Sequence, residues 1–320
     1  MKHSTKNYSI PEAGMAFQKI KENLGKIIRG KSRSLELTVC CLAAAGHVLL
    51  EDIPGTGKTM LAKSLAKTID GECKRVQFTP DLLPADVLGG AVYNPASGVF
   101  DFNPGPVFTN VLIADEINRA SARTQSALLE AMGEQQVSLD GTTYPLQSPF
   151  ICIATQNPLD FHGAYQLPEA QMDRFMASLR LGYVSEEEEL ELLQIGGMEN
   201  DLQQLKAVVT SEDLSLLQKV VPTVRIDQSI LRYMMNVIRT TRNTASIRLG
   251  ISTRGSLHWV AMAKAYAMLH GRDFVIPEDV CDIALPLLSH RLILNSKASS
   301  ESAAKTSVLD EVIKNTALPR

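Results

Sequence analysis

Hydrophobic residues in the first 184 positions follow two patterns in turn, short apolar runs and longer stretches of helical period. Before the first run, the spacing predicts a helix that ends near Gly30 and a second helix over 34–45. Strands that alternate with helices indicate an α/β fold with a parallel sheet covered on both faces. The apolar runs predict five strands, at 47–50, 74–78, 111–114, 150–155 and 177–181.

Two segments, 91–102 and 136–146, interrupt this alternation with the pattern of β-hairpins. The first surrounds a turn with Pro95 and Gly98, and the second contains Asp140-Gly141, a strong signal for a two-residue hairpin turn. Each hairpin is explained either as surface decoration or as a projection toward a partner or a central channel.

The pattern changes at Ser185, from which the chain is helical throughout. Ser185 precedes four glutamates, which is typical of a helix N-cap followed by an acidic first turn. We therefore expect two domains, a core at 1–184 that carries both hairpins and an all-helical domain with a tail at 185–320. Helices are expected at 214–221, 230–243, 255–269 and 277–292, with a linker at 296–305 before a last helix at 306–315.

Composition and charge are those of an ordinary soluble α/β protein. The 320 residues are 45% hydrophobic, and no run reaches the roughly 18 apolar residues of a membrane span. The polar start at 1–5 lacks the apolar stretch of a secretory signal, so we expect a cytoplasmic protein without membrane insertion. A net charge of -3 gives no general attraction to nucleic acid, although a local basic patch stays open. The five cysteines lack C-x-x-C spacing and indicate neither a disulfide framework nor a zinc site.

The segment between the first strand and the next helix has the composition of a polyphosphate-binding loop. At a helix N-terminus, unpaired backbone N–H groups and the helix dipole face an anion, while Gly55 and Gly57 let the backbone curl around it. Lys58 adds a positive charge, and Thr59 is placed to bind magnesium. The strict pattern has glycine where Asp52 stands, and a plain glycine turn is the alternative. The predicted nucleotide contacts are Pro54, Gly55, Thr56, Gly57, Lys58, Thr59 and Met60.

Two carboxylates, Asp115 and Glu116, end the apolar strand at 111–114. Successive strand residues point in opposite directions, which separates the two roles. Asp115 can hold the magnesium shell through water, while Glu116 faces the γ-phosphate side and orients an attacking water. The alternative is a strand that simply meets solvent, but paired buried acids repel one another without a cation.

Three further polar residues complete the candidate site. Asn157 follows the next strand and is held extended by Pro158, so its amide can bind a water or the γ-phosphate; a local Asn-Pro turn is the alternative. Arg254 falls near the start of a predicted helix, where the dipole disfavours a cation unless phosphate is bound. Arg174 is expected on a short polar helix, either as an ion-pair partner or as a finger in an adjacent subunit.

Together these residues resemble the AAA+ ATPases, and more narrowly the MoxR family, over about residues 15–295. The resemblance implies a P-loop AAA+ core, three layers around a parallel sheet, with a C-terminal all-helical lid. It departs from the family at Asp52 and at Gly133, which we expect to interrupt the helix after Met132. The segments that carry it are 76–84, 114–120, 124–132 and 167–175. The implied roles are Walker A for Lys58 and Thr59, Walker B for Asp115 and Glu116, sensor 1 for Asn157, arginine finger for Arg174 and sensor 2 for Arg254.

The resemblance also implies a magnesium-dependent ATPase that forms a ring, usually a hexamer, with ATP between subunits. The hairpins would match the helix-2 insert and the pre-sensor-1 hairpin of this clade. Such proteins remodel or mature client proteins, often with a partner that bears a von Willebrand factor A domain. The alternatives are a metal-chelatase motor subunit, a DNA-directed motor and a nucleotide switch. The net negative charge gives no sign of the basic channel that a DNA-directed motor would need, and the intact Glu116 argues against a nucleotide switch that does not hydrolyse ATP.

Overall fold

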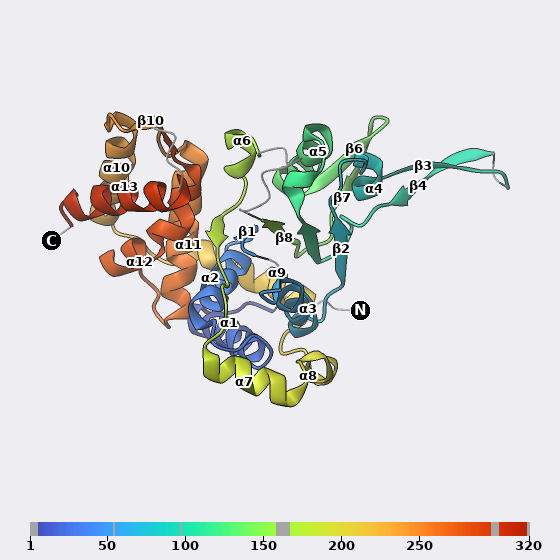
Figure 1. Cartoon of the computed structure of the whole chain (residues 1–320), viewed down its shortest axis with the longest axis horizontal. Helices are drawn as coiled ribbons and strands as arrows, with labels where there is room; N and C mark the ends of the chain where they lie inside the picture. Colours follow the sequence, from blue (N-terminus) through green and yellow to red (C-terminus); the bar gives the residue numbers. More distant parts are fainter. Residues whose placement is uncertain (1–5, 54, 97, 158–166, 296–300, 319–320) are drawn as a thin grey trace.

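A five-stranded parallel sheet forms the centre of the molecule, and it contains the five strands that the sequence predicts (Figure 1). The computed structural model describes residues 6–53, 55–96, 98–157, 167–295 and 301–318. The strand order is β2-β5-β8-β1-β9, and each neighbouring pair is parallel. The strands are β1 (Val48–Glu51), β2 (Cys73–Gln77), β5 (Val111–Asp115), β8 (Ile151–Gln156) and β9 (Ala177–Leu179).

Helices cover both faces of the sheet, because alternate strand residues are apolar in both directions (Figure 1). Val48 and Leu50 pack in one cluster with helices α1, α2 and α3, whereas Leu49 packs in a second cluster with α4 and α5. This is the three-layer arrangement expected from the sequence. The helices are α1 (Ile10–Gly25), α2 (Ser32–Ala43), α3 (Lys58–Thr68), α4 (Pro84–Leu88) and α5 (Ala122–Glu134).

Both predicted hairpins are present on the side of the sheet that carries α5 (Figure 1). One pairs β3 (Gly89–Asn94) with β4 (Val99–Pro104) and extends away from the body, and the other pairs β6 (Gln136–Leu139) with β7 (Thr142–Pro145). Phe102 of the first hairpin stacks on Tyr144 of the second, with ring centroids 3.9 Å apart. The stack braces the two hairpins against each other.

The C-terminal part is helical, with one short antiparallel pair of strands that the sequence analysis did not anticipate. The Lys67 side chain of α3 donates a hydrogen bond to Leu202 O of α8, so α8 packs on the core helices. Helices α10 to α13 group together on the other side of the molecule as a lid (Figure 1). The boundary at residue 184 stays a prediction. The elements are α7 (Glu186–Ile195), α8 (Glu199–Gln204), α9 (Ser211–Gln218), α10 (Gln228–Asn243), β10 (Ile247–Leu249), α11 (Thr253–Leu269), α12 (Pro277–Leu288), β11 (Ile293–Leu294) and α13 (Glu301–Asn315).

Several helix boundaries differ from the sequence-based expectation; the helix expected at 214–221, for example, spans Ser211–Gln218. The first helix ends at Gly25, not near Gly30, because Ile27 and Ile28 are buried in the turn that follows and continue the apolar spacing without helical bonding. The linker expected at 296–305 is too long, since α13 begins at Glu301; its small residues include alanines, which favour helix. The helix over 277–292 ends at Leu288 and gives way to a 3-10 turn. Within the described residues, each helix is too short or too polar to cross a bilayer.

The buried imidazole of His47 predicts a pH-dependent stability. Its Nδ1 accepts a hydrogen bond from Cys152 N–H, its Nε2 donates to Met132 O, and burial lowers its pKa from 6.5 to about 4. Below pH 6.5 the unfolded chain therefore binds a proton that the folded protein excludes, and the free energy of unfolding decreases as the pH is lowered. Between pH 7 and pH 5, urea unfolding should show that His47→Gln loses about 2 kcal/mol less than the wild type. Equal losses in the two proteins would contradict the assignment.

Candidate active site

The loop that precedes α3 forms the predicted anion cradle. Gly55 and Gly57 adopt positive φ angles of +84° and +89°, a conformation that other residues seldom accept, and nothing lies within 4 Å of a Cβ built at Gly55. Gly57 is the N-cap of α3, so the free N–H groups of the first helical turn lie at the loop. The Lys58 ammonium donates to Asp52 O and Ile53 O, both at 2.9 Å, which holds its charge beside the cradle.

A cavity of about 370 Å³ lies where this loop meets the carboxyl ends of three neighbouring strands. It brings together most of the predicted site residues. Thr56 is not among the lining residues, and its hydroxyl donates to Ile53 O; Pro54 lies outside the described residues. The lining comprises Gly55, Gly57, Lys58, Thr59, Met60, Arg75, Gln77, Asp115, Glu116, Thr155 and Asn157.

Thr155 positions both carboxylates at the end of β5. Its hydroxyl donates to Asp115 Oδ1 at 2.5 Å and accepts the Glu116 N–H at 2.9 Å. Glu116 has a φ of +55°, so the chain turns sharply where the strand ends and the two side chains separate. Both carboxylates are partly shielded, with exposed side-chain fractions of 14% for Asp115 and 25% for Glu116.

Strand β2 supplies two residues that the sequence analysis missed. Arg75 forms an ion pair with Asp115 Oδ2 at 2.6 Å, and Gln77 donates to Glu116 Oε2 at 2.9 Å. Arg119 donates to the same Glu116 oxygen at 2.8 Å. The signal was available in the strand register, because β2 pairs with β5 and places Gln77 opposite Asp115. Each carboxylate is thus held by a positive or polar side chain.

These residues fit a triphosphate with its magnesium ion. The cradle offers backbone N–H groups and an ammonium for phosphate oxygens, while Thr59 and Asp115 offer the hard oxygen ligands that Mg²⁺ prefers. Both Asp115 oxygens already accept hydrogen bonds, from Thr155 and Arg75, so this carboxylate suits a contact through metal-bound water. Mg²⁺ commonly keeps several waters in such sites.

Asp52, the departure from the strict loop pattern, is a buried anchor. It is 6% exposed, and its Oδ2 accepts the N–H groups of Leu181 and Gly182 at 2.8 and 2.7 Å. Its Oδ1 accepts the N–H of Ile53 at 2.9 Å. Glycine could make none of these side-chain bonds. The carboxylate therefore ties the phosphate loop to the chain that leaves β9 for the C-terminal helices.

The two candidate arginines lie elsewhere in the described structure, since neither is among the described residues that line the cavity. Arg174 lies two residues after the short helix α6 (Glu169–Met172), not on it as expected, because that helix ends after four residues. Its guanidinium donates to Leu129 O at 2.7 Å and fills the space beside Gly133. We expected Gly133 to interrupt the helix after Met132, but it lies inside α5. A Cβ at this position would overlap Arg174. Arg254 is exposed at the second residue of α11.

The fold and the site together define a P-loop ATPase domain of the AAA type with a helical lid. The family described as "ATPase family associated with various cellular activities (AAA)" matches residues 47–177, and the family described as "AAA lid domain" matches residues 239–312. Both matches agree with the observed core and lid.

Similar proteins narrow the class. The chain is 45% identical to the uncharacterised protein YeaC of Bacillus subtilis, over 93% of each chain. It is 39% identical to the chaperone MoxR1 of Mycobacterium tuberculosis, over 92% of this chain and 80% of that protein. A solved structure of a provisionally assigned ATPase from Cytophaga hutchinsonii superposes with a TM-score of 0.87 at 36% identity, over 97% and 98% of the two chains. The chain belongs to the MoxR family of AAA+ ATPases.

Removing the Asp52 carboxylate should destabilise the protein. Asp52→Ala leaves the N–H groups of Leu181 and Gly182 without their acceptor, and an unsatisfied buried donor costs about 1–3 kcal/mol. Urea unfolding should therefore show a lower midpoint for this variant. Glu130→Ala, which removes an exposed carboxylate from α5, should leave the midpoint near that of the wild type. A wild-type midpoint for Asp52→Ala would refute the anchoring role.

Proposed function

We propose that this protein is a magnesium-dependent ATPase that hydrolyses ATP to ADP and phosphate, and that it works as a ring to remodel or mature client proteins. One observation carries the catalytic part. A carboxylate, Glu116, lines the same cavity as a glycine-rich anion cradle and a second carboxylate, Asp115. That combination is suited to binding a nucleotide phosphate with its metal and to directing water at it.

Binding rests on the loop and on Lys58. A lysine ammonium has three donors, and loop carbonyls take two of them, which leaves one for a phosphate oxygen. The open space beside Gly55 lets the backbone approach the phosphates closely. Thr59 and Asp115 would hold Mg²⁺, which offsets phosphate charge when it is bound.

Hydrolysis rests on Glu116. An ionised carboxylate has about four acceptor positions, and Gln77 and Arg119 each donate one hydrogen bond to it. The remaining capacity suits an attacking water, which Glu116 would orient and from which it would accept a proton. Asn157 lines the same cavity and can bind that water or a phosphate oxygen without adding charge.

The position of the arginines supports an assembly. Transition-state charge on the γ-phosphate calls for a cation, and an arginine supplied in trans is worth roughly 10³ to 10⁵ in rate. Because Arg174 packs on α5 outside the cavity of its own subunit, we infer that it serves a neighbour's site. Arg254, on the lid, would reach the phosphate of its own subunit when the lid closes. A hexamer in the cytoplasm, acting with a protein that bears a von Willebrand factor A domain, is the assembly that we propose.

Two substitutions should separate binding from hydrolysis. Lys58→Ala removes the phosphate-facing charge and should abolish Mg-ATP binding in calorimetry. Glu116→Gln keeps the cradle and should bind Mg-ATP, but its turnover should fall by about 10² or more, because the amide is a poor base. Lys63→Ala, one turn along α3 and exposed, and Glu130→Gln are the matched controls. Normal binding by Lys58→Ala, or wild-type turnover by Glu116→Gln, would remove that residue from its assigned role.

Mixed rings should test whether Arg174 acts across an interface. Arg174→Ala subunits keep an intact cavity, and Lys58→Ala subunits keep an intact arginine, so each alone should be inactive. Mixed in equal amounts, they should recover up to about a quarter of wild-type turnover, the share of interfaces that random assembly completes. Mixtures that stay inactive at every ratio would place Arg174 outside the neighbour's site.

A further inference from the structure

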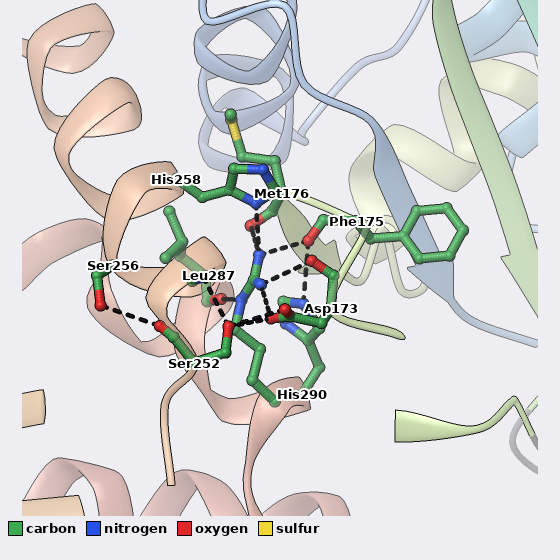
Figure 2. A network of polar contacts seen from close by, with 10 residues as sticks. Asp173, Phe175, Met176, Ser252, Ser256, His258, Leu287 and His290 are labelled. Carbon is green, nitrogen blue, oxygen red and sulfur yellow. Dashed lines mark hydrogen bonds and ion pairs between the residues drawn. The ribbon is translucent and has the colours of Figure 1, made fainter. Parts of the chain in front are cut away.

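Arg291 is a buried arginine that is not among the described residues lining the nucleotide cavity. Figure 2 shows the network of polar contacts around it, in which Asp173, Ser252 and His258 lie close together. The side chain of Arg291, in the turn after α12, is 1% exposed and forms an ion pair with Asp173. Its nitrogens also donate to Leu287 O at 2.9 Å, Phe175 O at 2.5 Å and Asp173 O at 2.9 Å. The guanidinium thus fastens the backbone that follows α6 to the end of α12.

Asp173 joins this cluster to a third element. The Ser252 hydroxyl lies 2.9 and 2.8 Å from the two Asp173 oxygens, and the same hydroxyl caps α11 by accepting Gly255 N–H at 2.9 Å. One turn into α11, His258 Nδ1 accepts a hydrogen bond from Arg291 at 2.8 Å. Burial and the charge of Arg291 lower the His258 pKa to about 4, so this ring is neutral and remains an acceptor at physiological pH. We call Asp173, Ser252, His258 and Arg291 the arginine hub.

The hub contacts the chain on either side of the two candidate arginines. Arg174 directly follows Asp173, and Arg254 lies two residues after Ser252. The α6 segment lies within residues 47–177, which match the AAA ATPase family, and α11 lies within residues 239–312, which match the AAA lid domain. Asp173 therefore joins the start of α11 directly to the backbone that carries Arg174.

Stability alone is a weak reason for such a cluster. A buried ion pair often adds no net stability relative to apolar residues of similar volume, because desolvation offsets the attraction, and its best-attested use is to fix one geometry. Here the geometry that is fixed is that of two segments, each of which carries an arginine. Several directed hydrogen bonds hold one guanidinium, which suits a rigid connection.

We propose that Arg291, Asp173 and Ser252 are positioning residues that make the lid and the Arg174 segment move as one unit. This inference rests on the proposed function, in which Arg254 contacts phosphate in its own subunit and Arg174 contacts that of a neighbour. Lid closure on Mg-ATP would then carry Arg174 to the orientation that the next subunit requires.

The test compares four substitutions in the full chain. Ser252→Ala removes the direct hydrogen bonds between α11 and Asp173, Asp173→Asn removes the ion pair with Arg291, Ser252→Thr keeps the hydroxyl, and Asp227→Ala removes the cap of α10 in the same lid without touching the hub. The first two should keep the dissociation constant for Mg-ATP within about twofold, while turnover falls by about tenfold to a hundredfold, because only positioning is lost. Ser252→Thr should restore most of the turnover, and Asp227→Ala should keep it. Asp173→Asn leaves the buried charge of Arg291 unpaired and can prevent folding. In that case the turnover of Ser252→Ala alone tests the proposal.

Hydrogen exchange gives a second readout. In a Glu116→Gln background, Mg-ATP should slow exchange together at 173–177 and at 253–257, and Ser252→Ala should abolish the effect at 173–177 alone. Any one of four results would overturn the proposal. Turnover could be unchanged in Ser252→Ala, Ser252→Thr could fail to restore it, or Asp227→Ala could lose as much. The fourth result is that hydrogen exchange at the two segments responds to Mg-ATP independently. If the wild type binds no Mg-ATP, the proposed function itself fails, a result that calorimetry distinguishes from all of these.

Discussion

The register of the central parallel sheet is the constraint on which the candidate site depends. β5 pairs with β2 on one side and with β8 on the other, and β8 pairs in turn with β1, so their carboxyl ends reach one edge together. Gln77 is therefore opposite Asp115, and Leu50 is opposite Thr155. A one-residue slip would turn every side chain of a strand to the other face. Alternate apolar residues that pack on both faces fix the register and, with it, the positions of the carboxylates.

The polar side chains of the site are held in place by hydrogen bonds and ion pairs between different strands and loops. Thr155 bonds the Asp115 carboxylate and the Glu116 backbone, and Asp52 ties the loop to the chain after β9. The pairing of Arg75 with Asp115 offsets a negative charge that would otherwise oppose its neighbour at the strand end. Metal and nucleotide would enter a site whose side chains are already oriented, which is the condition for efficient electrostatic catalysis.

The sequence predicted the features that local pattern determines. Strand runs, both hairpins and the loop glycines follow from short-range periodicity and turn chemistry, and the structure confirms them. The sequence analysis missed contacts that depend on strand register or that join distant parts of the chain. The contact of Gln77 with Glu116 follows only from the pairing of two strands, and Asp173 and Arg291 are separated by 118 positions. The expectation for Gly133 was wrong because one glycine costs a helix only about 1 kcal/mol, and α5 continues to Glu134. The packed structure adds that Arg174 fills the space beside this glycine.

The central claim is that Mg-ATP binds at the carboxyl edge of the sheet, and a calorimetric titration of the wild-type protein tests it most directly. With magnesium present, ATP should give a saturable heat for one site per chain, with a dissociation constant between about 1 μM and 1 mM, the usual range for enzyme substrates. Chelating the metal should weaken binding, because Thr59 and Asp115 would lose the ion that they share with the phosphates. The absence of any binding heat at millimolar Mg-ATP would contradict the account.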